Sequence, residues 1–250
     1  MIVLLLWSRA TEGKNNSSLV PLIIGGSNVK IQDYPYQLAL EIKNLQFCSA
    51  SIIATNKALT AAHCTFSMDK NRLNVRVGSE FRGKGGKTIK ALRVYNHPLF
   101  DTITDDYDVS IITLAENIKF YDMAKSVPLQ EKYDYIKDGQ KGVVSGWGNI
   151  YPFSKRPARI LQAVEVIKIN TDDCRQVYKV HDREVTKNMI CFGYPEGGKD
   201  ACHGDSGGPL VSDGKQVGIV SWGIGCGDRS YPGVYTRISA VRSYIDQFMR

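Results

Sequence analysis

The sequence lacks an apolar stretch long enough to cross a bilayer, and it lacks the closely spaced cysteine pairs found in most zinc sites. The longest strongly apolar run is IVLLLW at residues 2–7, far shorter than the roughly 20 residues that a membrane helix needs. No Cys-x-x-Cys motif occurs, and none of the histidines falls at zinc-ligand spacing beside cysteines (His63, His97, His181 and His203). We therefore expect neither a membrane-spanning segment nor a structural metal.

The short apolar run lies where the hydrophobic region of a secretory signal peptide would lie. Ser8 and Ala10 follow it as small residues, which predicts a signal peptide over residues 1–10 with cleavage after Ala10. The chain has six cysteines, and an even number in a secreted protein predicts disulfides formed in an oxidising compartment. Composition alone leaves their pairing open.

The chain carries a formal net charge of +7. The lysines are scattered, and the one basic cluster, RGKGGK at 82–87, has the composition of a loop. We interpret the charge as ordinary solubility charge rather than as a nucleic-acid-binding surface. Neither nucleic acid nor a membrane is expected as a partner.

Short β-rich runs separated by turn residues recur from residue 37 onward, and no alternating helices lie between them. This pattern predicts an all-β fold of antiparallel sheets. Two packed barrels fit the length, although the pattern alone does not exclude a single sandwich. Only the last stretch has helical periodicity, through Ile238, Val241, Ile245 and Phe248. The predicted strands lie in QLALEI, NVRVG, TIKALRVY, DVSIITL, GVVSGWG, LQAVEVIKI, QVGIVSWG and GVYTRI.

The segment DACHGDSGGP at 200–209 places Ser206 among glycines. The pattern fits both the nucleophile elbow of an α/β-hydrolase and the nucleophile loop of a protease. In an α/β-hydrolase the catalytic histidine follows the serine along the chain. Here the last histidine, His203, precedes Ser206, so a hydrolase elbow would lack its general base.

The best upstream candidate for a general base is His63, in LTAAHC, because an apolar strand and a cysteine flank it. The third member of a triad is an acid that orients the imidazole. Asp108 adjoins the apolar run VSIITL, which would carry it inward, so we expect it to be buried. Asp105 and Asp106 are interpreted as solvated loop carboxylates.

The order His63, Asp108, Ser206 is the order of the chymotrypsin-type triad. The motifs IIGG, TAAHC, DVSII, SGWG, DACHGDSGGP, VSWG and PGVYTR occur along residues 23–250. On these motifs the chain resembles the trypsin-like serine proteases (the chymotrypsin/trypsin family). It is most similar to the trypsins of arthropods, a group that includes mites.

The resemblance implies two six-stranded antiparallel β-barrels with the triad at their junction, a C-terminal helix and no cofactor. The backbone N–H groups of Gly204 and Ser206 would form an oxyanion hole, and Ser221 would support Asp108. The implied disulfides are Cys48–Cys64, Cys174–Cys191 and Cys202–Cys226.

Members of the family are made as zymogens, so residues 11–22 would be a propeptide before a protease domain over 23–250. Cleavage would free the amine of Ile23 to pair with the carboxylate of Asp205. The residue before the cut is Leu22 rather than Arg or Lys. We therefore predict that a protease that accepts leucine, or one of another class, makes the cut.

Asp200 matches the floor of the trypsin specificity pocket, six residues before Ser206. Gly223 and Gly233 match the pocket walls, beside Ala201, Ser221 and Trp222. The expected substrates are peptides cleaved after Arg or Lys. Ala201 removes a hydroxyl that many trypsins have there, so we expect Arg to be preferred over Lys, because its planar fork pairs bidentately with a carboxylate.

Other positions depart from the family pattern. Asp105 borders the site of the preceding substrate residue and is expected to face water, and His203 lies at the pocket rim. Ser49 and Ala50 replace glycines and are expected to crowd the nucleophile loop. VGSEFRGKGGKT has too many cations for the family's calcium loop.

We expect a secreted, monomeric digestive enzyme open to serine protease inhibitors. The alternative is a catalytically weak or inactive paralogue that binds or inhibits partners. A regulatory protease of the clotting type is disfavoured because no extra N-terminal module is evident.

Overall fold

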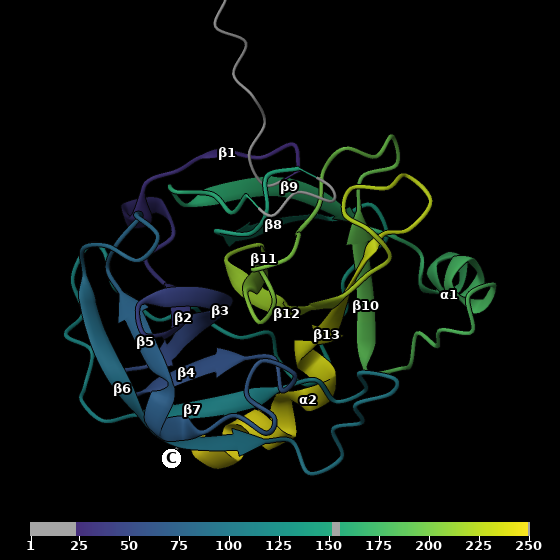
Figure 1. Ribbon diagram of the computed structural model, residues 1–250. Helices are drawn as coiled ribbons and strands as arrows, with labels where there is room; N and C mark the ends of the chain where they lie inside the picture. Colours follow the sequence, from purple (N-terminus) through teal and green to yellow (C-terminus); the bar gives the residue numbers. More distant parts are fainter. Residues whose placement is uncertain (1–23, 152–155, 250) are drawn as a thin grey trace, which may run out of the picture.

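The computed structural model describes residues 24–151 and 156–249. The predicted signal peptide, the propeptide and Ile23 lie outside the described residues. The predicted all-β architecture is confirmed, since two antiparallel barrels pack side by side (Figure 1).

The first barrel closes in the order β2-β3-β4-β7-β6-β5. Its inward positions follow the two-residue period of a strand, as in β5, where Val75 and Val77 are buried and their neighbours are partly exposed. The strands of this barrel are β2 (Gln37–Ile42), β3 (Leu45–Ala54), β4 (Lys57–Thr60), β5 (Asn74–Val77), β6 (Lys87–Asn96) and β7 (Ser110–Leu114).

The second barrel closes through pairing of β8 with both β9 and β11, and the short β1 adds to β9. Its core is a separate cluster that includes Val144, Val166, Phe192 and Leu210. Its strands are β8 (Lys141–Gly146), β9 (Gln162–Lys168), β10 (Met189–Gly193), β11 (Pro209–Ser212), β12 (Lys215–Trp222) and β13 (Gly233–Arg237), with β1 at Ser27–Asn28.

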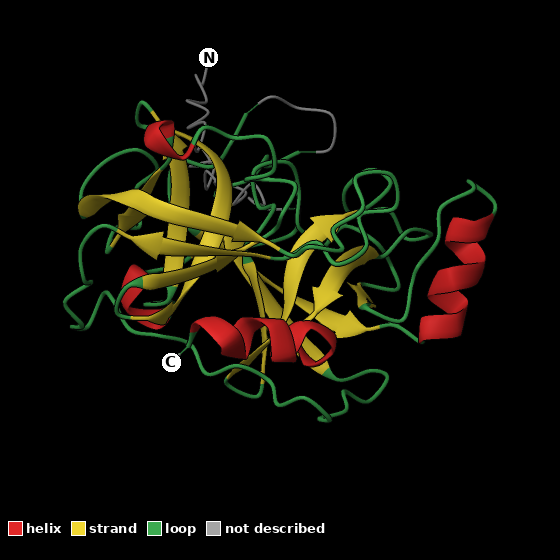
Figure 2. Ribbon diagram, turned by 90° about the horizontal axis from the view of Figure 1, so that it is seen from below, coloured by secondary structure: helices red, strands yellow, loops and turns green. Residues whose placement is uncertain are grey.

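The C-terminal helix α2 (Ile238–Ile245) follows directly on β13, and the short 3-10 helix Asp246–Phe248 continues it. Its buried residues Ile238, Val241 and Ile245 belong to the core of the first barrel. The helix therefore ties the two halves of the chain together, and Figure 2 shows it lying across the strands. Two further 3-10 helices lie at Ile31–Asp33 and Lys70–Arg72.

The prediction that only the C-terminal stretch is helical was wrong. A second helix, α1 (Thr171–Lys179), stands at the outer side of the second barrel (Figures 1 and 2). Its N-cap Asn170 accepts hydrogen bonds from the first turn, but only Cys174 and Tyr178 are buried. Two buried residues in a helix of nine give too weak a periodicity for recognition from sequence.

Three disulfides join Cys48–Cys64, Cys174–Cys191 and Cys202–Cys226, the pairs that the resemblance implies. In the parts of the chain that the structure describes, no helix is long and apolar enough to cross a membrane.

Candidate active site

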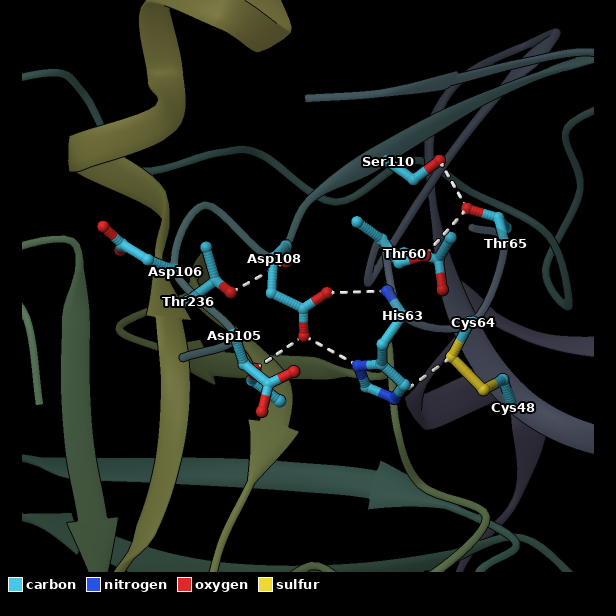
Figure 3. A network of polar contacts seen from close by, with 12 residues as sticks. Cys48, Thr60, His63, Cys64, Thr65, Asp105, Asp106, Asp108, Ser110 and Thr236 are labelled. Carbon is cyan, nitrogen blue, oxygen red and sulfur yellow. Dashed lines mark hydrogen bonds and ion pairs between the residues drawn. A yellow bond between two sulfur atoms is a disulfide. The ribbon is translucent and has the colours of Figure 1, made fainter. Parts of the chain in front are cut away.

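His63 and Asp108 are brought together by the pairing of β4 with β7. Thr60 at the end of β4 lies opposite Ser110 at the start of β7, so the residues just beyond these strand ends become neighbours. The His63 backbone N–H donates to Asp108 Oδ1 at 2.8 Å, and His63 Nδ1 lies 2.7 Å from Asp108 Oδ2. Figure 3 shows both contacts on the one carboxylate. This arrangement orients the ring and places Nε2 on the opposite side.

Asp108 is fully buried, and its remaining partners come from the second barrel. Ser221 Oγ donates to Asp108 Oδ2 at 2.6 Å, and Thr236 Oγ1 donates to the Asp108 backbone oxygen at 2.8 Å. A buried carboxylate is stable as an ion only when hydrogen bonds replace its hydration. The seam between the barrels supplies those hydrogen bonds.

The environment of His63 favours the protonated imidazole. Burial lowers the pKa of His63, but the hydrogen bond and charge of Asp108, with a smaller effect of the Asp105 charge, outweigh it, so the pKa is raised. The side chain keeps 30% of its surface exposed. The imidazole can therefore accept a proton from a group in the cleft, and its charged form is stabilised when it does.

Ser206 lies on the loop before β11 and helps to line a cavity. Its backbone oxygen accepts from the Ser49 N–H at 2.8 Å, which fixes the loop to the first barrel. Among the described residues, no hydrogen bond joins Ser206 Oγ to His63 Nε2, whose recorded neighbour is Cys64 Sγ at 3.6 Å. Of the predicted triad, the structure therefore joins His63 and Asp108 by a hydrogen bond. In the described chain, Ser206 Oγ is not hydrogen-bonded to His63.

One group of potential metal ligands surrounds the histidine. Within the described part of the chain, Cys48, His63 and Cys64 place a ligand atom each within 4.8 Å of one another. Metals bind cysteine as the thiolate, and both of these sulfurs are joined in a disulfide. This group is therefore not a metal site.

Two backbone N–H groups of the loop before β11 have no hydrogen-bond partner among the described residues. Asp205 N–H donates to Cys202 O at 2.9 Å, whereas the N–H groups of Gly204 and Ser206 on either side of it donate to no other described residue. Gly204 has φ of +101°, a conformation that favours glycine. Two such unpaired donors, beside a serine, form the geometry that can stabilise a developing oxyanion.

Asp205 is fully buried behind this loop. Its Oδ1 accepts from the Gly148 N–H at 2.7 Å and its Oδ2 from the Cys202 N–H at 3.0 Å. Burial raises the pKa of Asp205 to about 6, although the two hydrogen bonds lower it. A Cβ at Gly146 or Gly148 would lie 2.2 or 2.4 Å from an Asp205 oxygen. The glycines of the SGWG motif are thus required by the buried carboxylate, a reason that the sequence does not reveal.

The cavity beside Ser206 has a volume of about 230 Å³. Its walls come from the end of β12, the start of β13 and the loop closed by the disulfide between Cys202 and Cys226. The lining residues include Asp200, Ala201, His203, Ser206, Ser221, Trp222, Gly223 and Gly233.

Among the described residues, Asp200 is the one carboxylate that lines the cavity. It is 6% exposed; its Oδ2 accepts from the Gly227 N–H at 3.0 Å, and its Oδ1 is buried without a hydrogen-bond partner in the described chain. Burial raises the pKa of Asp200 to about 7, and the charge of Asp205 adds to this effect. A buried acceptor without a partner is costly, so the site gains when a cation enters.

The glycines in the walls keep the path to this carboxylate open. A Cβ at Gly233 would lie 2.8 Å from Asp200 Oδ1, and a Cβ at Gly223 would lie 3.9 Å from the Gly233 Cα on the opposite wall. Any side chain at these two positions would fill the cavity. The arrangement can accept a long, unbranched cationic side chain.

The first described residue packs beside the floor of the cavity. Ile24 is buried with Cys202 and Cys226, and its backbone oxygen accepts from the Asp200 N–H at 3.1 Å. A Cβ at Gly25 would lie 2.2 Å from the Gly198 oxygen, so the chain can approach this closely only with glycine there.

The interpretation of Asp105 and Asp106 as solvated carboxylates was wrong. Asp105 is 21% exposed in its side chain and pairs with Arg183 Nη2 at 3.0 Å. Asp106 Oδ1 accepts from Thr186 Oγ1 at 2.7 Å and from Asn188 Nδ2 at 3.1 Å. These partners lie about eighty residues further along the chain, so no local pattern identifies them.

Ser49 and Ala50 are fully buried in β3. The Ser49 hydroxyl donates to the Gly204 oxygen at 3.3 Å, and Gln46 Nε2 donates to the same oxygen at 2.7 Å. Sequence reasoning missed Gln46, whose own oxygen accepts from Arg82 Nε at 2.8 Å. The expected crowding of the nucleophile loop by Ser49 and Ala50 stays a prediction.

Comparisons with known proteins agree with this geometry. A model of the trypsin family matches residues 23–245. The chain belongs to the trypsin family. It is 39% identical over 226 residues to "Trypsin 5G1" of Aedes aegypti, covering 90% of this chain and 84% of that protein.

Two further relatives extend the likeness across arthropods. The chain is 39% identical over 225 residues to the "Vitellin-degrading protease" of Bombyx mori, covering 90% of this chain and 84% of the relative. It is 38% identical over 225 residues to "Trypsin Blo t 3" of the species Blomia tropicalis, covering 89% and 84%. The predicted likeness to arthropod trypsins is confirmed, and the chain is a serine endopeptidase of the trypsin family that acts on protein substrates.

Proposed function

We propose that this protease cleaves peptide bonds after arginine, and less efficiently after lysine, through an acyl-enzyme at Ser206. The observation that carries the proposal is Asp200, a buried carboxylate with one unpaired oxygen at the bottom of a glycine-walled cavity of about 230 Å³. A guanidinium that enters this cavity would supply the missing hydrogen bond and the opposite charge together.

In the first half of the proposed reaction, Ser206 Oγ attacks the carbonyl carbon while its proton passes to His63 Nε2. The negative charge that develops on the carbonyl oxygen is stabilised by the N–H groups of Gly204 and Ser206, which have no other described partner. Asp108 holds the ring and stabilises its charge. The imidazolium then gives the proton to the leaving amine as the carbon–nitrogen bond breaks.

In the second half, water attacks the ester carbonyl. His63 takes a proton from the water and returns it to Ser206 Oγ, which releases the carboxylic acid and restores the enzyme. The contact between His63 Nε2 and Ser206 Oγ must form for either half. Such hydrogen bonds are often long before substrate binds.

Chromogenic peptides that differ only in an Arg, Lys or Phe before the scissile bond test the proposal. We expect the kcat/KM values to fall in the order Arg, Lys, Phe, and a covalent serine inhibitor to abolish all turnover. Equal values for Arg and Lys would refute the arginine preference, because Ala201 would then not handicap lysine. A preference for Phe would refute the role of Asp200.

We further propose that cleavage between Leu22 and Ile23 activates the protein and that the new amine of Ile23 pairs with Asp205. The packing of Ile24 against Cys202 and its bond with Asp200 support this, because they place the start of the protease domain beside the loop. Incubating the precursor with its own active form should release no Ile23 N-terminus. Leu22→Arg should make the same bond self-cleavable, and failure of that variant to activate would count against the site.

Secretion, a monomeric state and a digestive role complete the proposal, with serine protease inhibitors as partners. An active-site titrant should give a burst of one product molecule per protein. A burst well below that value, in protein with an Ile23 N-terminus, would favour the alternative of an inactive paralogue that binds or inhibits partners.

A further inference from the structure

A salt bridge crosses the cleft beside the cavity and joins the two barrels. Asp105 lies on the loop between β6 and β7, and Arg183 lies on the loop between α1 and β10. Arg183 Nη2 lies 3.0 Å from Asp105 Oδ2, and the Arg183 guanidinium carbon lies 4.3 Å from the centre of the Trp222 ring. The pair therefore covers the face of a tryptophan that also lines the cavity.

Several contacts fix this pair in place. Asp106, next to Asp105, binds Thr186 and Asn188 on the segment that follows Arg183. Below the guanidinium, the Trp222 ring packs edge-on against Tyr178 at 4.8 Å. Because both loops are anchored, the ion pair is preorganised rather than formed on demand.

Arg183 has hydrogen-bond donors that its ion pair with Asp105 does not use. The side chain of Arg183 is 34% exposed, against 21% for Asp105. A guanidinium has five N–H donors, and among the described residues the Arg183 guanidinium donates one recorded hydrogen bond, to Asp105. The exposed part of the guanidinium can therefore bind a further acceptor. The guanidinium also covers ring surface of Trp222 that an apolar side chain would otherwise contact.

We propose that Arg183, held by Asp105 over Trp222, determines specificity by binding a carboxylate side chain of the substrate on the N-terminal side of the residue held in the cavity. The same guanidinium disfavours large apolar residues at that place, since it occupies the aromatic surface. This inference rests on the proposed function, because the cavity must hold the residue before the scissile bond.

Peptides with Arg before the scissile bond test it, with Glu, Gln or Phe placed in turn at each of the three preceding positions. Glutamate and glutamine have the same shape, so their kcat/KM ratio isolates charge. An exposed charge pair is expected to change this ratio about twofold to fivefold. We expect the wild type to prefer Glu over Gln by that factor at one or more positions and to disfavour Phe there.

The two partners of the salt bridge should change the ratio in opposite directions. Arg183→Gln leaves Asp105 unpaired, so the Glu/Gln ratio should fall below one, and cleavage with Phe should improve. Asp105→Asn leaves the guanidinium uncompensated, so the ratio should rise above that of the wild type. Lys141→Gln is the matched control, because it removes a surface cation paired with Glu165 at 3.0 Å and should leave the ratio unchanged.

A wild-type ratio of one or less at all three positions, or a ratio that Arg183→Gln does not lower, would overturn the inference. In that case the peptides with Gln would still be cleaved after Arg. If the wild type cleaves no arginyl peptide at all, the proposed function fails instead.

Discussion

Replacing Asp200 by asparagine should make the protein less active and more stable at the same time. The substitution keeps the shape of the side chain and removes its charge. The carboxylate is 6% exposed, and one of its oxygens has no hydrogen-bond partner in the described part of the chain. Both the binding of a cation and the folding of the empty protein therefore depend on that charge.

The loss of activity follows from the buried pair that a substrate arginine would form. Removing one member of a buried, hydrogen-bonded charge pair costs about 2–5 kcal/mol or more. Because the Asp200 carboxylate is buried, we take about 3–5 kcal/mol, which corresponds to roughly 100- to 5,000-fold in kcat/KM for arginyl peptides. Peptides with Phe or Leu before the scissile bond should change less than about threefold, because their side chains make no charge pair.

The gain in stability follows from the raised pKa of Asp200. A shift from 3.8 to about 7 means that the ionised carboxylate destabilises the fold by roughly 4 kcal/mol once both states are ionised. Well below pH 3.8 the carboxyl group is protonated in both the folded and the unfolded chain, so it adds no pH-dependent cost. The cost grows as pH rises toward 7. Asp200→Asn should therefore be closest to the wild type at pH 4 and exceed it by up to roughly 4 kcal/mol at pH 8.

Urea unfolding at pH 4, 6 and 8 measures this difference. Both proteins should carry Ser206→Ala, which removes the nucleophile and so prevents self-digestion during the measurement. The reasoning would be refuted by a variant that is less stable than the wild type at pH 8. It would also be refuted by equal losses of kcat/KM for arginyl and phenylalanyl peptides.

Three further substitutions test other contacts. Ser221→Ala removes a buried hydrogen bond of 2.6 Å to Asp108, so kcat should fall about tenfold with KM unchanged, and Ser221→Thr should retain most of the activity. Asp105→Asn removes a negative charge that helps to raise the pKa of His63, so the acidic limb of the kcat/KM profile, below which the imidazole is protonated, should move to lower pH. Gly233→Val fills the cavity, so cleavage after Arg should fall by at least about 100-fold while cleavage after Ala persists.

The sequence was sufficient for the fold where burial follows a simple period. Strand β5, in which partly exposed and buried residues alternate, lies within the predicted run NVRVG at residues 74–78. Strand β3 was not among the predicted strands, because Ser49 and Ser51 are buried in it among apolar residues. Each hydroxyl finds a distant acceptor, the Gly204 oxygen or Gln216 Oε1, and these partners compensate a burial that the local composition argues against.

Some residues of the candidate site could likewise be predicted from the sequence, and others could not. His63 and Asp108 could be proposed because each adjoins an apolar strand end, and a strand end fixes where a side chain lies. The partnership of Asp105 with Arg183 could not, since its two members lie on loops of different barrels, 78 positions apart. Contacts of this kind form only when the two barrels pack together. The local sequence around each residue therefore carries no signal for them.

The buried carboxylate of Asp205 shows how one loop could couple activation to catalysis. Its pKa of about 6, against an ordinary value of 3.8, means that the ionised form costs roughly 3 kcal/mol at neutral pH when only two N–H groups compensate it. A positively charged amine beside it would remove this cost. The Gly204 and Ser206 N–H groups flank the same residue. Pairing of the amine with Asp205 would therefore also fix the two donors that the proposed reaction needs. Asp205 lies between the two donors along the chain. Cleavage before Ile23 would therefore change the position of the groups that stabilise the oxyanion.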